Sequence, residues 1–135
     1  MSLAIFGTVF LIAFEGTVLL TPVAIALGKR WEIVDRPGGR RRHKGIMPRI
    51  GGLALYPAFA LAALVPVWIG IPRNDPLELT RLTGVLIGMG LVWVVGLLDD
   101  RYQLPPMTQF AGLFVAALVA IAFKVFIERF NNPLV

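Results

Sequence analysis

The sequence predicts an all-α protein, a polytopic bundle of transmembrane helices, on three observations. Its 135 residues are 57% apolar, with a mean hydropathy of +0.78, which is far above the values of ordinary soluble domains. Apolar stretches long enough, or nearly long enough, to cross a bilayer recur along the chain. The positive charge gathers in the connection after the first stretch. We therefore expect about four spans, at 3–27, 50–71, 82–98 and 107–127.

The first span is expected to stay in the mature protein. No Lys or Arg precedes it, its apolar run is too long for a signal peptide, and no small-residue cleavage site precedes the basic connection. Glu15 lies near its middle, where a carboxylic acid costs a few kcal/mol and usually faces the bundle. Two interpretations of Glu15 stay open: a group on a substrate or proton path, and a packing residue that is protonated or hydrogen-bonded.

The connection between the first two spans carries most of the positive charge of a chain whose net charge is +5. Short loops rich in Lys and Arg stay on the cytoplasmic side of a membrane. The amino terminus and loop 72–81 are therefore expected outside, and loops 28–49 and 99–106 inside. Against Glu32 and Asp35, the basic residues of the connection are Lys29, Arg30, Arg36, Arg40, Arg41, Arg42, Lys44 and Arg49.

This basic connection also has features of an anion site. Positive-inside bias alone explains its charge, and the charge would attract anionic lipid headgroups at about 1 kcal/mol per basic residue. Neither explanation accounts for the neighbouring motifs His43-Lys44-Gly45 and Pro48-Arg49-Ile50-Gly51-Gly52. Glycines that open a helix let backbone N–H groups approach a phosphate, and nearby Lys and Arg would neutralise it. A phosphate or diphosphate is the ligand that this pattern favours.

The third span ends on Asp99-Asp100-Arg101, where two local rules are broken. The carboxyl end of a helix disfavours anions, and two carboxylates at roughly 5 Å repel each other by about 3 kcal/mol at an effective dielectric of about 20. Arg101 would offset part of this repulsion, and a hard cation such as Mg²⁺ would offset more. A solvated interfacial loop is the other interpretation. Adjacent helical residues also diverge by about 100°, so the two carboxylates need not bind one ion.

An anion site and a carboxylate pair on one cytoplasmic surface are what phosphoryl transfer requires. The chain has no cysteine, and its one histidine, His43, excludes a multi-histidine metal site within it. A small transporter is disfavoured, since no span is duplicated or broken as midplane sites require. No nucleic-acid partner is expected.

The motifs together resemble one enzyme family. Asp35-Arg36-Pro37-Gly38-Gly39-Arg40, His43-Lys44-Gly45, Pro48-Arg49-Ile50-Gly51-Gly52 and Gly96-Leu97-Leu98-Asp99-Asp100-Arg101 are similar to the polyprenyl-phosphate N-acetylhexosamine-1-phosphate transferases (glycosyl transferase family 4). The resemblance runs from about Leu19 to Ala117. It looks closest to the undecaprenyl-phosphate N-acetylglucosamine-1-phosphate branch, because the peptidoglycan branch typically has threonines where this chain has Ile46, Met47 and Arg49.

The resemblance implies a reaction. A polyprenyl (undecaprenyl) phosphate would attack the sugar-linked phosphate of a UDP-sugar, in the synthesis of a lipopolysaccharide, teichoic acid or other cell-wall glycan. UMP would be released, with Mg²⁺, or Mn²⁺ in its place, as cofactor. Asp99 and Asp100 match the catalytic and metal-binding pair of the family. The substrate-binding candidates are Arg40, His43, Lys44, Arg49, Gly51, Gly52 and Arg101.

The chain also departs from the family, whose members have many more spans. Residues 1–135 are therefore expected to be an amino-terminal portion of a larger transferase, inactive alone, that needs the missing carboxy-terminal half and a further metal ligand. Its location would be the plasma (inner) membrane, with the active face cytoplasmic and membrane lipids around it; a homodimer is left open. The alternatives are a phospho-N-acetylmuramoyl-pentapeptide transferase and a non-catalytic four-helix module that binds anionic lipid.

Overall fold

The structure, a computed structural model, describes residues 3–35, 47–49, 52–72 and 75–125. These segments form four helices and one short pair of antiparallel strands. The predicted all-α class is confirmed, because each strand is only two residues long. The helices are α1 (Leu3–Arg30), α2 (Gly52–Trp68), α3 (Glu78–Tyr102) and α4 (Pro106–Ala122), and the strands are β1 (Val34–Asp35) and β2 (Met47–Pro48).

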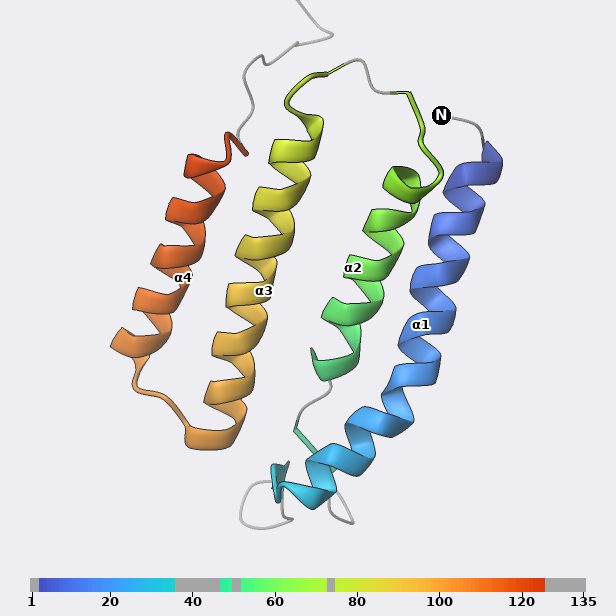
Figure 1. Ribbon diagram of the computed structural model, residues 1–135. Helices are drawn as coiled ribbons and strands as arrows, with labels where there is room; N and C mark the ends of the chain where they lie inside the picture. The colour runs from blue at the N-terminus through green and yellow to red at the C-terminus, as the bar shows by residue number, and fades with distance from the viewer. Residues whose placement is uncertain (1–2, 36–46, 50–51, 73–74, 126–135) are drawn as a thin grey trace, which may run out of the picture.

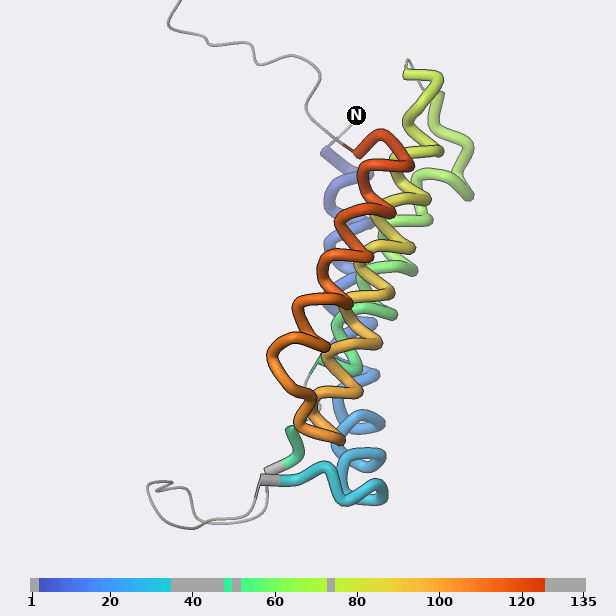
Figure 2. Tube along the Cα trace, turned by 90° about the vertical axis from the view of Figure 1, so that its left-hand side faces the viewer, coloured from blue at the N-terminus to red at the C-terminus, as the bar shows by residue number. Residues whose placement is uncertain are grey.

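The helices alternate in direction and form two hairpins, α1 with α2 and α3 with α4, which meet where α2 packs against α3 (Figure 1). Seen from the side, the four helices lie in a narrow slab (Figure 2). The β1–β2 pair and the turn between α3 and α4 therefore lie at one end of the bundle, and the link from α2 to α3 lies at the other. The two segments singled out in the sequence, basic connection and aspartate pair, share an end as predicted.

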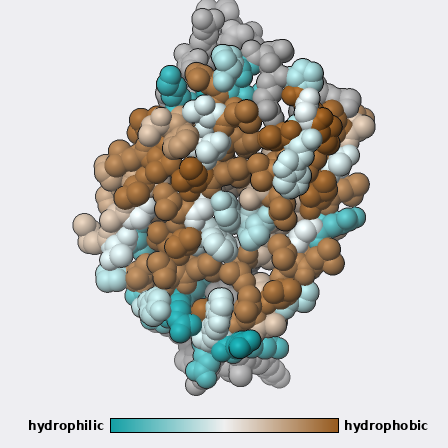
Figure 3. Space-filling model, viewed as in Figure 1, coloured by the Kyte–Doolittle hydropathy of each residue, from teal (hydrophilic) through white to brown (hydrophobic). Residues whose placement is uncertain are grey.

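The surface of the bundle is that of a membrane protein. Large apolar side chains are exposed along all four helices, and they cover most of the middle of the visible face, with hydrophilic residues toward both ends (Figure 3). Helices α1 and α3 are long and apolar enough to cross a bilayer. Helices α2 and α4 have 17 residues each, so each is about 25 Å long, close to the hydrocarbon thickness of about 30 Å.

Small residues make the helix contacts. Apart from Ile33 and Val65, the buried apolar residues of the described segments are alanines. A Cβ at Gly16 of α1 would lie 3.3 Å from the Cβ of Ala58 in α2, and a Cβ at Gly88 of α3 would lie 3.5 Å from the Ala116 carbonyl oxygen in α4. Lipid already solvates large apolar side chains, so helices in a membrane associate where small residues let their backbones approach.

Two hydrogen bonds join the hairpins across the α2–α3 contact. The Tyr56 hydroxyl donates to the Leu86 carbonyl at 2.7 Å, and the Trp93 indole N–H donates to the Gly52 carbonyl at 3.0 Å. The two rings also contact each other, with centroids 5.4 Å apart. Gly90 makes room for this arrangement, because a Cβ there would lie 2.8 Å from the Tyr56 hydroxyl oxygen. In hydrocarbon, a polar group without a partner is costly, so these bonds fix the spacing of α2 and α3.

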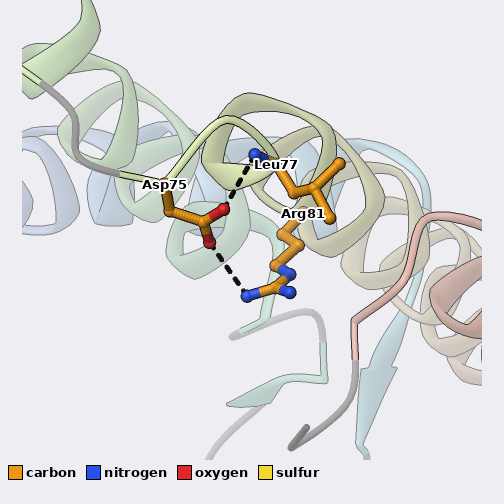
Figure 4. Close-up of polar contacts among 3 residues, drawn as sticks. All are labelled: Asp75, Leu77 and Arg81. Atoms are coloured by element: carbon orange, nitrogen blue, oxygen red, sulfur yellow. Dashed lines mark hydrogen bonds and ion pairs between the residues drawn. The ribbon is translucent and has the colours of Figure 1, made fainter.

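The opposite end of the bundle has its own polar contacts (Figure 4). Asp75 accepts a hydrogen bond from the Leu77 backbone N–H at 2.9 Å through Oδ1, and its Oδ2 pairs with the Arg81 guanidinium at 2.9 Å. Both side chains of the ion pair are partly exposed, so the pair contributes at most about 1 kcal/mol. It orders the start of α3, far from the aspartate pair.

Glu15 departs from the expectation that it would face the bundle. Its side chain is exposed on α1, while the neighbouring Gly16 faces Ala58 of α2. Because adjacent helical residues point about 100° apart, a face that buries Gly16 leaves Glu15 outside. Among the described residues Glu15 has no hydrogen-bond partner.

We predict opposite effects for two glycine substitutions in the α3–α4 hairpin. A Cβ at Gly112 would lie 2.6 Å from Cγ2 of Val95, a stiff side chain. Gly112→Ala should therefore lower the free energy of unfolding by about 1–3 kcal/mol.

Gly96→Ala is the matched control, because a Cβ there meets nothing within 4 Å. It should stabilise the protein by up to about 1 kcal/mol through helix propensity alone. Thermal unfolding in detergent, followed by circular dichroism, measures both; equal effects of the two substitutions would contradict the predicted packing.

Candidate functional site

The end of α1 holds the returning strand of the basic connection. After α1, Glu32 adopts a left-handed conformation with φ 56°, which lets the Ile33 N–H bond the Gly28 carbonyl at 2.9 Å. Ile33 is buried, and its carbonyl accepts the Arg49 backbone N–H at 3.0 Å. Next to this bond, β1 and β2 pair in antiparallel register, Val34 with Pro48. The backbone of Arg49 is therefore fixed against the end of α1.

Helix α1 itself reaches under α2 toward the end of α3. It contains Pro22, which removes one helical hydrogen bond and favours a bend, and α1 bends in its second half (Figure 1). The Arg101 guanidinium, in the last turn of α3, donates to the Trp31 carbonyl just beyond α1, at a long 3.5 Å. Residues 70 positions apart are thus brought to one place.

Helix α3 continues past the apolar stretch that ends at Leu98, so the aspartate pair lies in its last turn. Asp99 is occupied by the turn to α4. Its Oδ1 accepts the Leu104 backbone N–H at 2.9 Å and the Gln109 side-chain amide at 2.7 Å. Its backbone carbonyl accepts the N–H of Gln103, a left-handed residue with φ 51°, at 2.8 Å. Asp99 therefore positions the start of α4 relative to the end of α3.

Asp100 points elsewhere, into a cavity of about 330 Å³ between the end of α3 and the basic connection. We call this space the polar cavity. The divergence of neighbouring helical side chains separates the two carboxylates, as the sequence analysis allowed. The cavity is lined by Trp31, Glu32, Ile33, Val34, Arg49, Asp100, Arg101, Tyr102 and Gln103.

The Asp100 carboxyl lies beyond the apolar part of α3, partly buried and near one cationic and one anionic side chain. Burial raises the pKa of its carboxyl above the usual 3.8, the nearby Arg49 guanidinium lowers it, and the neighbouring Asp99 carboxylate raises it, with a raised pKa as the result. The Arg101 guanidinium, also at the cavity, lies 5.5 Å from the centre of the Tyr102 ring. An anion entering this space would meet two guanidinium groups beside a carboxylate that binds protons or cations readily.

The structure brings together three of the predicted site residues, Arg49, Asp100 and Arg101, and turns Asp99 toward α4. Gly52 opens α2 with free space around it, but it lines a second, apolar cavity. The remaining predicted residues, Arg40, His43, Lys44 and Gly51, lie outside the described residues.

Three important residues were not predicted from the sequence. Gln109 holds Asp99, and Glu32 and Gln103 end two helices in left-handed conformations at the rim of the polar cavity. Glycine is the usual residue at such positions, so a search for helix ends by their glycines misses both. The hydrogen bond between Gln109 and Asp99 depends on the fold of the turn, and no pattern in the sequence predicts it.

The described residues offer part of a metal site. No group of three or more His, Asp or Glu side chains lies close enough together in this part of the chain to hold an ion. Glu32 and Asp100 both line the polar cavity, and carboxylate oxygens suit Mg²⁺, which commonly takes one or two of them and completes its shell with substrate phosphates and water. The donor set therefore fits a partial Mg²⁺ site.

Known proteins similar to this chain are N-acetylglucosamine phosphotransferases named for undecaprenyl phosphate or decaprenyl phosphate. A probable undecaprenyl-phosphate N-acetylglucosaminyl 1-phosphate transferase of Bacillus subtilis is 27% identical over 124 residues, 92% of this chain and 32% of the relative. The undecaprenyl-phosphate alpha-N-acetylglucosaminyl 1-phosphate transferase of Haemophilus influenzae is 34% identical over 88% of this chain and 29% of the relative. The decaprenyl-phosphate N-acetylglucosaminephosphotransferase of Mycolicibacterium smegmatis is 34% identical over 73% of this chain and 24% of the relative.

The chain thus spans about a quarter to a third of the length of the curated relatives it matches. No family model matches it, and no solved structure matches it either.

The two aspartates should differ in their effect on stability. Asp99→Ala leaves the Leu104 N–H and the Gln109 amide without an acceptor, so it should cost about 1–3 kcal/mol of unfolding free energy. Asp99→Asn keeps an oxygen in place and should lose less. Thermal unfolding in detergent measures the stability of both variants. Equal stability of Asp99→Ala and the unsubstituted chain would contradict the role of Asp99 in holding the turn between α3 and α4.

Asp100→Asn should leave stability unchanged or raise it at neutral pH. The pKa of Asp100 is raised in the folded chain, so ionising it costs folding free energy as the pH rises from the unfolded value through the folded one, and the cost persists above both. Asparagine removes that cost. The difference from the unsubstituted chain should therefore vanish below about pH 3.8; a stability loss at pH 7 would contradict the prediction.

Proposed function

The chain belongs to the polyprenyl-phosphate N-acetylglucosamine-1-phosphate transferase family, and on this premise we propose that it carries part of the active site of such an enzyme. The reaction transfers N-acetylglucosamine-1-phosphate from a UDP-sugar to polyprenyl (undecaprenyl) phosphate. The observation that carries the proposal is the polar cavity, where Arg49 from the basic connection and Asp100 from the end of α3 meet.

In the proposed reaction, a phosphate oxygen of the lipid attacks the sugar-linked phosphorus of the UDP-sugar. The bond from that phosphorus to the oxygen shared with UMP breaks, UMP leaves with the electron pair, and a polyprenyl diphosphate sugar remains. The arginines of the cavity, Arg49 and Arg101, bind phosphate oxygens and neutralise their charge. Asp100, which lines the same cavity, accepts the proton of a monoprotonated lipid phosphate.

A Mg²⁺ or Mn²⁺ ion would supply charge neutralisation on the diphosphate. Asp100 would hold it, with Glu32 of the polar cavity and the free oxygen of Asp99 as further candidates, and the remaining ligands would come from phosphates, water and residues outside the described segments. Asp99 mainly positions the start of α4, because its Oδ1 is used by the turn between α3 and α4. Of the residues outside the described segments, we propose Arg40, His43, Lys44 and Gly51 as further phosphate and substrate contacts.

The orientation follows from charge. The basic connection and the aspartate pair share one end of the bundle, and short loops rich in Lys and Arg stay in the cytoplasm. We therefore propose that the protein lies in the plasma (inner) membrane and that this end of the bundle faces the cytoplasm, the compartment in which UDP-sugars are made. The product would be a lipid intermediate of lipopolysaccharide, teichoic acid or another cell-wall glycan. The N-acetylglucosamine named in the relatives supports that sugar over N-acetylmuramoyl-pentapeptide.

The chain alone should lack activity. It spans under a third of the B. subtilis relative, and the described residues hold no group of three or more side chains that could bind a metal ion. The complete enzyme would need the remaining spans, which supply further ligands for the metal and the uridine, and a homodimer is compatible with this arrangement. Purified chain with UDP-N-acetylglucosamine, undecaprenyl phosphate and Mg²⁺ should release no UMP above background; measurable turnover would contradict this expectation.

Binding of the lipid phosphate tests the proposed function directly. In nanodiscs of zwitterionic lipid, the chain should bind radiolabelled undecaprenyl phosphate more tightly than undecaprenol, because only the phosphate meets the arginines. Arg49→Gln should weaken binding of the phosphate by about tenfold or more, the value of one charge-assisted hydrogen bond.

Lys124→Gln is the matched control, since this exposed cation follows α4 at the opposite end of the bundle; it should leave binding unchanged. Equal affinity for undecaprenol and its phosphate would sink the proposal. Displacement of the bound lipid by phosphatidylglycerol at equal concentration would instead indicate a module that binds anionic lipid in general.

A further inference from the structure

A second cavity lies between the helices in the apolar part of the bundle. It measures about 710 Å³ and is lined by residues of all four helices. Its walls include Ala13 of α1, Phe59 of α2, Gly88 of α3 and Ala117 of α4. We call it the apolar cavity; its volume is in the range of small-molecule sites.

Every polar side-chain group on its walls already has a partner. The Thr17 hydroxyl donates to the Ala13 carbonyl at 2.8 Å, and the bonds of Tyr56 and Trp93 to carbonyls across the α2–α3 contact measure 2.7 and 3.0 Å. Water needs two to four polar partners to occupy a cavity stably. A sugar or nucleotide would also leave its hydroxyls unpaired here. The chemistry of the walls therefore favours a hydrocarbon occupant.

The cavity is kept open by its composition. Glycines and alanines of α3 and α4 leave space where larger side chains would fill it, as at Gly88 and Ala120. The hydrogen bonds of Tyr56 and Trp93 hold α2 and α3 at a fixed distance. The hollow thus follows from the bonds and small residues that join the two hairpins.

The apolar cavity lies next to the polar cavity. Gly52 and Trp93, which are joined by a hydrogen bond, both line the apolar cavity. Gly52 begins α2, and α2 begins at the end of the bundle that holds the β1–β2 pair (Figure 1). Gly52 follows Arg49 by three residues, and Trp93 precedes Asp100 by seven, which is two helical turns, about 10 Å along the same face of α3. A molecule with a phosphate at one end and a hydrocarbon chain at the other matches this order.

We propose that the apolar cavity holds the first isoprene units of the polyprenyl phosphate acceptor, with the phosphate at Arg49 and the rest of the chain in the bilayer. This inference rests on the proposed function for the identity of the lipid. It adds a chain-binding site made by α1 to α4, which would align the phosphate and raise affinity for a long isoprenoid. In this arrangement, the hydrogen bond from Trp93 to Gly52 lies between the phosphate at Arg49 and the isoprene units in the apolar cavity.

Filling the cavity provides the test. Both Ala117 and Ala111 of α4 are exposed, but only Ala117 lines the cavity. In phosphatidylcholine nanodiscs, Ala117→Phe should weaken binding of radiolabelled undecaprenyl phosphate by tenfold or more, and Ala111→Phe should leave it unchanged. Circular dichroism and thermal unfolding report whether each variant folds.

Cross-linking of the unsubstituted chain keeps the test decisive if Ala117→Phe fails to fold. Undecaprenyl phosphate with a diazirine on its first isoprene unit should label residues of the apolar cavity, such as Met89 and Leu113, and excess phosphatidylcholine should not prevent it. Labelling confined to residues outside the lining of the cavity, such as Leu118, or lost to excess phosphatidylcholine, would overturn the chain-binding site.

The two proposals fail in different ways. If undecaprenyl phosphate still binds better than undecaprenol but Ala117→Phe, shown to be folded, has no effect on it, the chain-binding site is wrong and the proposed function stands. If the phosphate gives no advantage over the alcohol, the proposed function fails, and with it the identity of the lipid in the cavity.

Discussion

The contact between α2 and α3 is the constraint on which the rest of the structure depends. Each hairpin is held by small residues that let its two helices approach, but the hairpins are joined to each other by the hydrogen bonds of Tyr56 and Trp93. These bonds set the position of the end of α3 relative to the end of α1. The polar cavity forms because Asp100 and Arg101 lie beside Trp31 and Arg49. The apolar cavity lies between the two hairpins that the same hydrogen bonds join at a fixed spacing.

The aspartate pair illustrates how adjacent residues of one kind take different tasks. Asp99 uses one carboxylate oxygen to hold the first turn of α4, and Asp100 faces the polar cavity beside Arg49. The two anions at this helix end differ in their surroundings. Asp99 accepts N–H groups of the following turn. Asp100 keeps a raised pKa, because burial and the neighbouring Asp99 carboxylate outweigh the Arg49 guanidinium.

Features with a strong local signal were predicted correctly. Long apolar runs gave the all-α membrane class, which the four apolar helices bear out. The motif set gave the family, which the relatives confirm. The expectation that Glu15 would face the bundle was wrong for these four helices, since the cost of a carboxylic acid in a membrane does not say which face of α1 packs on α2. The roles of Arg40, His43, Lys44 and Gly51 stay predictions.

The sequence by itself determined that this protein lies in a membrane, which family it belongs to and which kinds of residue form its site, because hydropathy, charge bias and motif spacing are properties of short segments. Only the tertiary structure decided that Asp100 lies with Arg49 while Asp99 turns to Gln109, and that an apolar cavity adjoins the polar one. These outcomes depend on the rotation and spacing of packed helices. A rotation of one residue, about 100°, would exchange the two aspartates without any change in pattern.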